Sequence, residues 1–162
     1  MMHLLSSTKN GEIRREMKSD TLTTLQKFNR LWDNVNAAYH KASGRMGFSD
    51  SERTILYMLC DYQRPMSQNE IIRLTGLSKQ TVNSSVSRMK KAGWLAMGER
   101  SNRQMLMSLT DQGREVVQEK LVPFMADETQ IFEHWTAEDQ NTLIELMERY
   151  EKSLAEIVDN MD

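Results

Sequence analysis

Apolar residues recur every three or four positions in the first part of the chain, which is the spacing of a buried helix face. From Ser19 to Ala42 this spacing predicts one long amphipathic helix. Ser49 and Glu52 have the S-x-x-E spacing of a capping box, which predicts the start of a second helix. The Arg64-Pro65 pair predicts the end of that helix, because proline disfavours helical backbone at the residue before it.

The last fifty or so residues show the same helical spacing. Thr110 predicts the N-cap of a helix that extends to about Phe132. Pro123 lies inside this helix and should bend it by removing one hydrogen bond. Thr136 predicts the cap of a final helix, whose first turn is acidic. The chain is therefore expected to be mainly helical at both ends.

Two short helices are predicted between these long ones. Ser67 and Glu70 form a second capping box, and Gly76 stops the first short helix. Ser78 is a further N-cap only two residues later, and it predicts a helix from about Lys79 to Ala92. Because the turn leaves no room for a strand, the two segments are expected to form a helix-turn-helix.

A short hairpin is predicted directly after these helices. Residues 94–97 and 105–109 favour two strands, and the polar sequence GERSNRQ between them forms the tip. Two helices joined by a tight turn and followed by a β-ribbon are typical of a winged helix-turn-helix. This arrangement suits the major groove of DNA.

The second short helix separates into an apolar and a polar face. Val82, Val86 and Met89 form the apolar stripe. The opposite face is rich in amides and hydroxyls and has no carboxylate, whereas a solvated face usually mixes Glu with Lys. Such a face can pair with base edges without repelling phosphates, although an ordinary exposed face is the alternative. The expected DNA contacts from this helix are Lys79, Gln80, Thr81, Asn83, Ser84, Ser87, Arg88 and Lys91.

Further DNA contacts are expected from the hairpin tip and from helix ends. The planar guanidinium of arginine suits a narrow minor groove or a phosphate. Taken alone, a polar tip is more typical of solvated surface, but its position after the second short helix favours DNA. The tip residues expected to reach DNA are Arg100, Asn102 and Arg103. Phosphate contacts are expected from Ser67, Gln68 and Lys90.

The segment TGLSKQTVNSSVSRMKKAGWL, followed by a polar tip and LTDQG, resembles the MarR family of bacterial transcriptional regulators. The resemblance covers most of the chain and implies a dimeric winged-helix protein, in many members a repressor, whose terminal helices form the dimer interface. Leu109, Thr110 and Gly113 match the family's L-T-x-x-G. The family's tip usually has Asp-x-Arg. Here Ser101 replaces the Asp, which in the family is thought to orient the wing arginine, while Arg103 matches the Arg, and the DNA-binding assignment is unaffected.

Charge is distributed unevenly along the chain. The net charge is −2. Residues 64–114 nevertheless carry nine Lys/Arg against three Asp/Glu, while residues 115–162 carry three against thirteen. The positive block coincides with the helix-turn-helix and the hairpin, which is the electrostatic pattern expected of a DNA-binding segment.

The final helix carries apolar residues at alternating spacings of four and three, which is a heptad seam. A monomer would bury this seam against its own first helix, and a dimer would bury it across a two-fold axis. We favour the dimer, because one recognition helix contacts too few base pairs to be selective, so the expected partner is a palindromic operator in double-stranded DNA. The residues expected at the interface are Leu22, Leu25, Leu143, Met147, Tyr150, Leu154 and Ile157.

Catalytic signals are missing from the sequence. It contains no zinc-ligand spacing, no glycine-rich phosphate loop and no G-x-S-x-G elbow, so neither an enzyme nor a metal or other cofactor is expected. Cys60, the single cysteine, falls in an apolar helix pattern, where a thiol is usually a small hydrophobe of low reactivity. One cysteine and no membrane-length apolar stretch favour the cytoplasm.

A small aromatic effector is implied by the resemblance, because many MarR relatives bind small aromatic or phenolic acids between the dimerisation helices and the winged domain. The candidates in the matching regions are Trp32, Tyr39, Phe48 and Tyr57. Aromatic side chains at these spacings are, however, more often part of a core.

We therefore expect a mainly α, winged helix-turn-helix protein in four segments: a polar tail (1–18), an N-terminal dimerisation helix (19–48), a DNA-binding domain (49–113) and C-terminal dimerisation helices (114–162). The predicted function is a homodimeric, sequence-specific DNA-binding regulator that acts as a repressor and is released by a small effector. The alternatives are a winged-helix protein-interaction module without DNA binding, and a redox-sensing regulator that uses Cys60.

Overall fold

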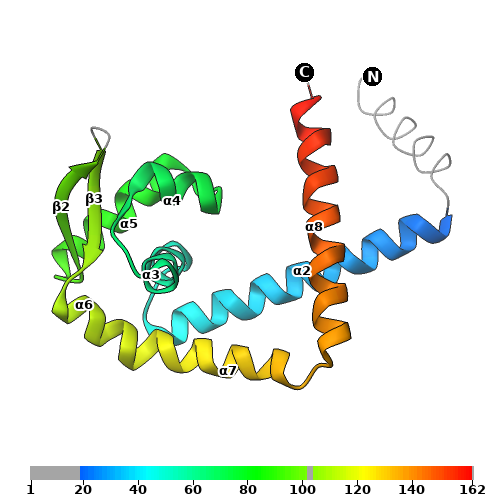
Figure 1. Cartoon of the computed structure of the whole chain (residues 1–162), viewed down its shortest axis with the longest axis horizontal. Coiled ribbons are helices and arrows are strands. Elements are labelled where there is room, and N and C mark those ends of the chain that lie inside the picture. Colours follow the sequence, from blue (N-terminus) through cyan, green and yellow to red (C-terminus); the bar gives the residue numbers. More distant parts are fainter. Residues whose placement is uncertain (1–18, 102–103, 162) are drawn as a thin grey trace, which may run out of the picture. The chain divides into compact units, whose positions relative to one another are not determined.

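The computed structural model describes residues 19–101 and 104–161. The chain forms two compact units, one up to Ile55 and one from Leu56 onward, and the boundary falls within helix α3. Figure 1 shows the order of the elements, with a small sheet among otherwise helical segments. None of the helices in the described ranges is long and apolar enough to cross a membrane.

Helix α2 (Ser19–Met46) extends four residues beyond the predicted end at Ala42. The Oγ of Ser43 donates to the carbonyl of Tyr39 (2.9 Å) within the helix, and the helix continues through Gly44. It stops before Gly47, whose φ of +79° is a left-handed conformation that favours glycine. The predicted end was wrong because the second glycine, and not the first, takes the terminating conformation.

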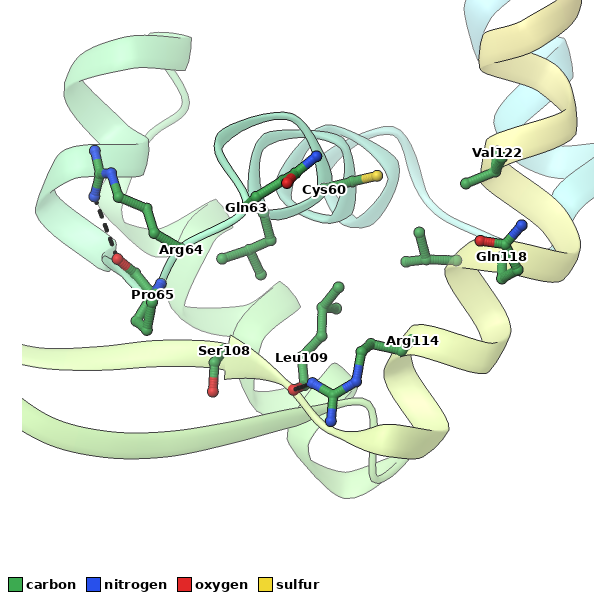
Figure 2. Close-up of a pocket in the computed structure, with 11 residues that line it drawn as sticks. Cys60, Gln63, Arg64, Pro65, Ser108, Leu109, Arg114, Gln118 and Val122 are labelled. Carbon is green, nitrogen blue, oxygen red and sulfur yellow. Dashed lines mark hydrogen bonds between the residues drawn. The ribbon is translucent and has the colours of Figure 1, made fainter.

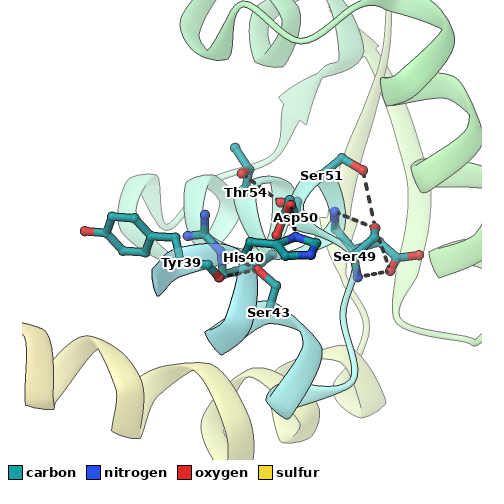
Figure 3. Close-up of polar contacts among 9 residues, drawn as sticks. Tyr39, His40, Ser43, Ser49, Asp50, Ser51 and Thr54 are labelled. Atoms are coloured by element: carbon teal, nitrogen blue, oxygen red, sulfur yellow. Dashed lines mark hydrogen bonds and ion pairs between the residues drawn. The ribbon is translucent and has the colours of Figure 1, made fainter. Parts of the chain in front are cut away.

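Helix α3 (Asp50–Tyr62) begins at the predicted capping box. The Ser49 N–H donates to Glu52 Oε2 (2.8 Å), and the Glu52 N–H donates to Ser49 Oγ (3.3 Å). Nearby, Asp50 Oδ2 accepts a hydrogen bond from His40 Nδ1 (2.7 Å), which ties the first turn of α3 to the end of α2 (Figure 3). The hydrogen bond from His40 is the largest cause that lowers the pKa of Asp50. These contacts fix the corner between the two helices of the first unit.

Helices α4 (Gln68–Thr75) and α5 (Lys79–Lys91) form the predicted helix-turn-helix. The Glu70 N–H donates to Ser67 Oγ (3.2 Å) at the start of α4, and Gly76 is the C-cap. The Thr81 N–H donates to Ser78 Oγ (3.1 Å) at the start of α5. Both predicted caps are confirmed, because a cap depends on residues only three positions apart.

A three-stranded antiparallel sheet with the order β1-β3-β2 contains the hairpin. Strands β2 (Leu95–Ser101) and β3 (Gln104–Leu109) lie side by side next to the helix-turn-helix (Figure 1). Both strands extend into the sequence predicted as a polar tip. The two-residue strand β1 (Met66–Ser67) was not predicted, because it exists only through its pairing with Met107 and Leu106 of β3.

Helix α6 (Asp111–Val116), the π-helical segment η1 (Val117–Leu121) and helix α7 (Val122–Glu133) follow one another without a break. The Thr110 N-cap is confirmed, since its Oγ1 accepts from the Gly113 N–H (2.9 Å). The sequence predicted a bend at Pro123; the structure has a π turn directly before it, where the Val122 N–H bonds to the Val117 carbonyl, five residues back. The wider turn relieves the clash that a proline ring makes with the carbonyl four residues before it.

Helix α8 (Ala137–Asp159) begins at the predicted Thr136 cap, whose Oγ1 accepts from the Asp139 N–H (3.1 Å). None of its residues is buried. The core of the second unit instead lies beneath the helix-turn-helix and the sheet, where large apolar side chains are fully or almost fully buried: Leu56, Met66, Ile71, Val82, Met89, Met107 and Leu121.

Candidate nucleic-acid interface

Helix α5 is held by a buried stripe of Val82, Ser85, Val86 and Met89. Ser85 is fully buried, and its small side chain widens the stripe without adding bulk. A turn of only three residues joins α4 to α5, so the position of α5 follows from the packing of the whole helix-turn-helix. The opposite face of α5 is therefore presented to solvent on a rigid support.

The solvent face of α5 contains the residues predicted to contact DNA. All of them are exposed except Thr81, which is half-buried: Lys79, Gln80, Asn83, Ser84, Ser87, Arg88 and Lys91. Lys90 is also exposed. The sequence of α5 has no carboxylate, and its last turn carries three basic residues. The structure thus gathers the predicted residues on one positively charged face, which is the requirement for contact with a phosphate-lined groove.

Some side chains on this face form hydrogen bonds within α5 or to its cap, and others do not. Thr81 Oγ1 bonds Ser78 Oγ (2.8 Å), Ser84 Oγ donates to the Thr81 carbonyl (3.0 Å), and Arg88 Nη2 donates to Ser85 Oγ (3.2 Å). Within the part of the chain that the structure describes, the side chains of Gln80, Asn83 and Ser87 make no hydrogen bond. Their amide and hydroxyl groups are the ones most available for base edges.

The predicted phosphate contacts are not equivalent. Ser67 is only 7% exposed, and its Oγ is occupied by the cap of α4. Gln68 is half-buried at the first position of α4, where the helix dipole attracts anions. Lys90 is exposed on α5. Gln68 and Lys90 therefore stay predicted phosphate contacts, whereas the Ser67 hydroxyl is used by the helix cap.

The hairpin brings Arg100 opposite Met105 in the strand register. The register shifts between Met97 and Arg100, which marks a bulge in β2. Asn102 and Arg103, the other predicted tip residues, lie outside the described residues. The backbone of Arg100 is in β2, so this residue belongs to a strand and not, as predicted, to a loop.

An ion pair that the sequence reasoning missed joins the end of α3 to α4. Arg64 Nη2 lies 2.5 Å from Glu70 Oε1, and Arg64 Nη1 donates to Glu70 Oε2 (3.2 Å). The hydrogen bond from Arg64 is the largest cause that lowers the pKa of Glu70. Glu70 was assigned only to a helix cap. Arg64, six positions before Glu70, could have indicated an ion pair. The two side chains meet, however, only if the chain turns at Pro65.

The candidate effector residues are spread over several elements. Trp32 and Tyr39 lie on α2, Phe48 precedes α3, and Tyr57 lies on α3. Phe48 is buried, and Arg53 lies over the Tyr39 ring at 4.9 Å. None of the four lines the cavity of about 460 Å³ in the second unit (Figure 2). Cys60 does line this cavity, and burial raises the pKa of its thiol.

The predicted interface residues carry much exposed apolar surface. On α8, Tyr150 is 41% exposed, Leu154 is 45% and Ile157 is 60%. Leu143 and Met147 are half-buried on the same helix. On α2, Leu22 is half-buried and Leu25 is 37% exposed.

Among the described residues, no group of three or more His, Cys, Asp or Glu side chains is placed to hold a metal ion.

Comparison with known proteins supplies independent information. Residues 46–102 match the sequence model of the MarR family. This range covers α3, the helix-turn-helix and β2. A search of curated protein sequences gives no match.

Three solved structures illustrate the similarity in fold. A MarR family transcriptional regulator from Streptomyces coelicolor, in complex with DNA, is 19% identical, with a TM-score of 0.72 over 85% of this chain and 93% of that one. A MarR family regulator from Neisseria meningitidis is 17% identical, with a TM-score of 0.73 over 84% and 96%. MarR from Staphylococcus aureus, in complex with salicylate and kanamycin, is 13% identical, with a TM-score of 0.66 over 84% and 93%.

The sequence match falls on the helix-turn-helix, and the structural matches extend over most of the chain. The resemblance that the sequence predicted and the winged-helix fold are both confirmed. Together the matches show that residues 46–102 are similar in sequence to the MarR family and that most of the chain has the winged helix-turn-helix fold of the solved MarR family structures.

Proposed function

We propose that this chain is a cytoplasmic, homodimeric repressor that binds a palindromic operator in double-stranded DNA. A small-molecule effector releases it from the operator. The observation that carries the proposal is the solvent face of α5. Among the described residues, the amides of Gln80 and Asn83 on this face have no hydrogen-bond partner, and the sequence of α5 is basic and has no carboxylate. An amide can both donate and accept, so Asn or Gln can form a bidentate pair with adenine.

The surroundings of α5 support the same function. Lys79, Lys90 and Lys91 flank the amides and can neutralise phosphates on either side of a major groove. Residues 64–114 have a net charge of +6, so the field around this segment attracts DNA although the whole chain is slightly acidic. The Streptomyces coelicolor relative in complex with DNA supports a DNA-binding role for this fold.

The proposed dimer, repression and effector rest on separate support. Exposed apolar residues on α8 are suited to a second copy of the chain, and two recognition helices would contact two half-sites about 34 Å apart or a multiple of this distance. Repression is the role implied by the family resemblance. The Staphylococcus aureus relative in complex with salicylate supports a small aromatic effector.

The test is a selection of bound duplexes from a random DNA library by the purified full chain at roughly physiological salt. We expect enrichment of a palindrome whose half-sites lie one helical turn, or a multiple of it, apart. If no DNA is retained even at low salt, the proposal is overturned. The winged helix would then be a protein-interaction module whose polar α5 face binds a protein partner.

Variants then assign roles within the selected operator. Gln80→Ala and Asn83→Ala should relax sequence choice, and Arg103→Ala should weaken binding, each by about 1–3 kcal/mol. Asn141→Ala on α8 is the matched control, because it removes an exposed amide far from α5 in sequence. Wild-type affinity and sequence choice in all three test variants would remove these roles.

A further inference from the structure

Four of the 13 methionines of the chain lie in the small sheet: Met66 in β1, Met97 in β2, and Met105 and Met107 in β3. Strands usually favour β-branched and aromatic residues. The sequences of β1, β2 and β3 contain no Val, Ile, Thr or aromatic residue. Strand propensity therefore does not explain why methionine occupies these positions.

The four methionines share one face of the sheet. In the strand register, Met107 lies opposite Met66 on one side and opposite Met97 on the other. Met105 comes two residues before Met107 on the same strand, so its side chain points to the same face. Met66 and Met107 are fully buried, whereas Met97 is half-buried and Met105 is 40% exposed. The row of thioethers therefore begins in the core and ends at the surface.

Met97 and Met105 line one recess of about 190 Å³ at the surface end of this row. They are diagonal neighbours on adjacent strands, a separation of about 7–8 Å that long side chains can span. The other residues that line the recess are Ser67, Gln68 and Asn69. Two thioether side chains thus border one space that is accessible from solvent.

The lining of the recess selects the kind of ion that it can take. Within the described ranges, no carboxylate, imidazole or thiol lines it, so divalent cations lack their usual ligands there. Thioether sulfur is a soft, uncharged ligand that selects Cu(I). The recess also borders the first turn of α4, where the helix dipole repels positive charge. An ion of single charge is repelled less than a divalent one.

We propose that Met97 and Met105 form a binding site for a soft monovalent cation, Cu(I) or its analogue Ag(I), with one thioether from each strand of the hairpin. Each sulfur donates a lone pair to the ion, and neither a proton nor an electron is transferred. The sequence reasoning considered only His, Cys and carboxylate ligands, and these two methionines meet only through the pairing of β2 with β3. Binding of the ion does not depend on the proposed function of the chain.

The competing explanation for these methionines is packing, because methionine fills irregular gaps in a core. The buried Met66 and Met107 fit that role. Met105 fits it poorly, since 40% of its surface is exposed. A packing role predicts that leucine can replace Met97 and Met105 without any change in ion binding.

The test titrates Ag⁺, in chloride-free buffer, into the full chain with Cys60→Ser, because the thiolate of Cys60 would otherwise compete for the ion. Methionine methyl groups labelled with carbon-13 are followed by NMR, and the affinity is measured by calorimetry. We expect the methyl signals of Met97 and Met105 to shift together as a single equivalent of Ag⁺ binds, whereas Zn²⁺ should leave both signals unchanged.

Leucine variants identify the ligands. Met97→Leu and Met105→Leu should each lower the Ag⁺ affinity by about tenfold or more, since even the loss of a group that merely supports a metal ligand costs that much. Leucine and methionine have similar volumes, so both variants should fold. Met161→Leu is the matched control, because Met161 is a 72% exposed thioether beyond the end of α8. It should bind Ag⁺ as the parent chain does.

The pH dependence separates this site from one that contains histidine. A thioether has no proton to lose, so the Ag⁺ affinity should be equal at about pH 6 and pH 8, whereas a histidine ligand would weaken binding at the lower pH. The proposal is overturned if Ag⁺ does not bind, if all the methionine signals shift alike, or if both leucine variants keep the parent affinity. The NMR titration needs only the parent chain, so it decides the question even if a variant folds poorly.

Discussion

Gly113 packs its Cα against the backbone carbonyl of Trp94, and a Cβ at position 113 would overlap that carbonyl oxygen. The contact joins the first turn of α6 to the residue just before β2. Two hydrogen bonds maintain it: the Thr110 N–H donates to the Trp94 carbonyl (3.0 Å), and Thr110 Oγ1 donates to the Gly93 carbonyl (2.5 Å). The L-T-x-x-G sequence is thus a packing element that sets where the helix after the hairpin begins.

Gly113→Ala should therefore destabilise the fold by about 3 kcal/mol, because the obstacle is backbone and cannot move aside as a side chain would. The measurement is urea unfolding followed by circular dichroism. Gly44→Ala is the matched control: it lies inside α2 with no atom near the new Cβ, and it should be neutral or stabilise by up to about 1 kcal/mol. Equal stability of the two variants would show that the Trp94 contact does not limit position 113.

Local signals in the sequence predicted much of this fold. The caps at Ser49, Ser67, Ser78, Thr110 and Thr136 are all present, because each depends on side-chain and backbone groups within three residues. The buried stripe of α5 was predicted for a similar reason, since its spacing follows from the helix itself.

The sequence did not predict features that depend on contacts between residues far apart in the chain. Strand β1 exists only through Met107 and Leu106 of β3. The hairpin strands extend as far as Ser101 and Gln104, because ladder pairing outweighs the polar composition there. Pro123 predicted a bend, whereas the structure has a π turn whose Val117 and Leu121 are packed in the core, and packing of this kind involves residues far away in the sequence. The Arg64–Glu70 ion pair was missed because it forms only when the turn at Pro65 brings the end of α3 back to α4.

The Arg64–Glu70 pair gives stability a dependence on acid pH. The pKa of Glu70 is lowered from its ordinary value of 4.5, chiefly by the hydrogen bond from Arg64. Because the folded pKa lies below the unfolded one, the contribution of the pair is fully present above about pH 4.5 and is lost as pH falls through the folded pKa. We expect the stability difference between the wild type and Glu70→Gln to shrink as pH falls below 4.5.

Thermal unfolding from pH 7 to pH 3 measures this difference. The control is the same substitution in an Arg64→Gln background, where the partner is absent and the pH-dependent part of the difference should vanish. A difference that stays constant with pH in both backgrounds would mean that Arg64 does not stabilise the Glu70 carboxylate.

Cys60 should not act as a peroxide sensor. Burial is the largest cause that raises the pKa of its thiol, and the nearby charge of Asp61 raises it further. The reactive thiolate is therefore scarce at neutral pH. We expect operator affinity to be unchanged within about twofold after mild peroxide treatment, measured by fluorescence anisotropy with Cys60→Ser as the comparison. Loss of affinity in the wild type alone would restore the redox-sensing alternative.

The exposed apolar face of α8 should be the contact between two copies of the chain. Tyr150, Leu154 and Ile157 follow the spacing of four and three along one stripe, and each is at least 41% exposed. A second copy that buries these side chains removes apolar surface from water and stabilises the dimer. Sedimentation equilibrium at micromolar concentration should give about twice the chain mass of 18.9 kDa.

Ile157→Asp should weaken the dimer by roughly 2 kcal/mol or more, because it places a carboxylate in the apolar stripe that a second copy of the chain would bury. Ala155→Asp adds the same charge at an exposed position of α8 that lies off the stripe, so it should leave the mass unchanged. If the wild type is a stable monomer, or if both variants dissociate equally, the stripe does not mediate self-association. A dimer sensitive only to Ile157→Asp would place two copies of α5 on one molecule, as a palindromic operator requires.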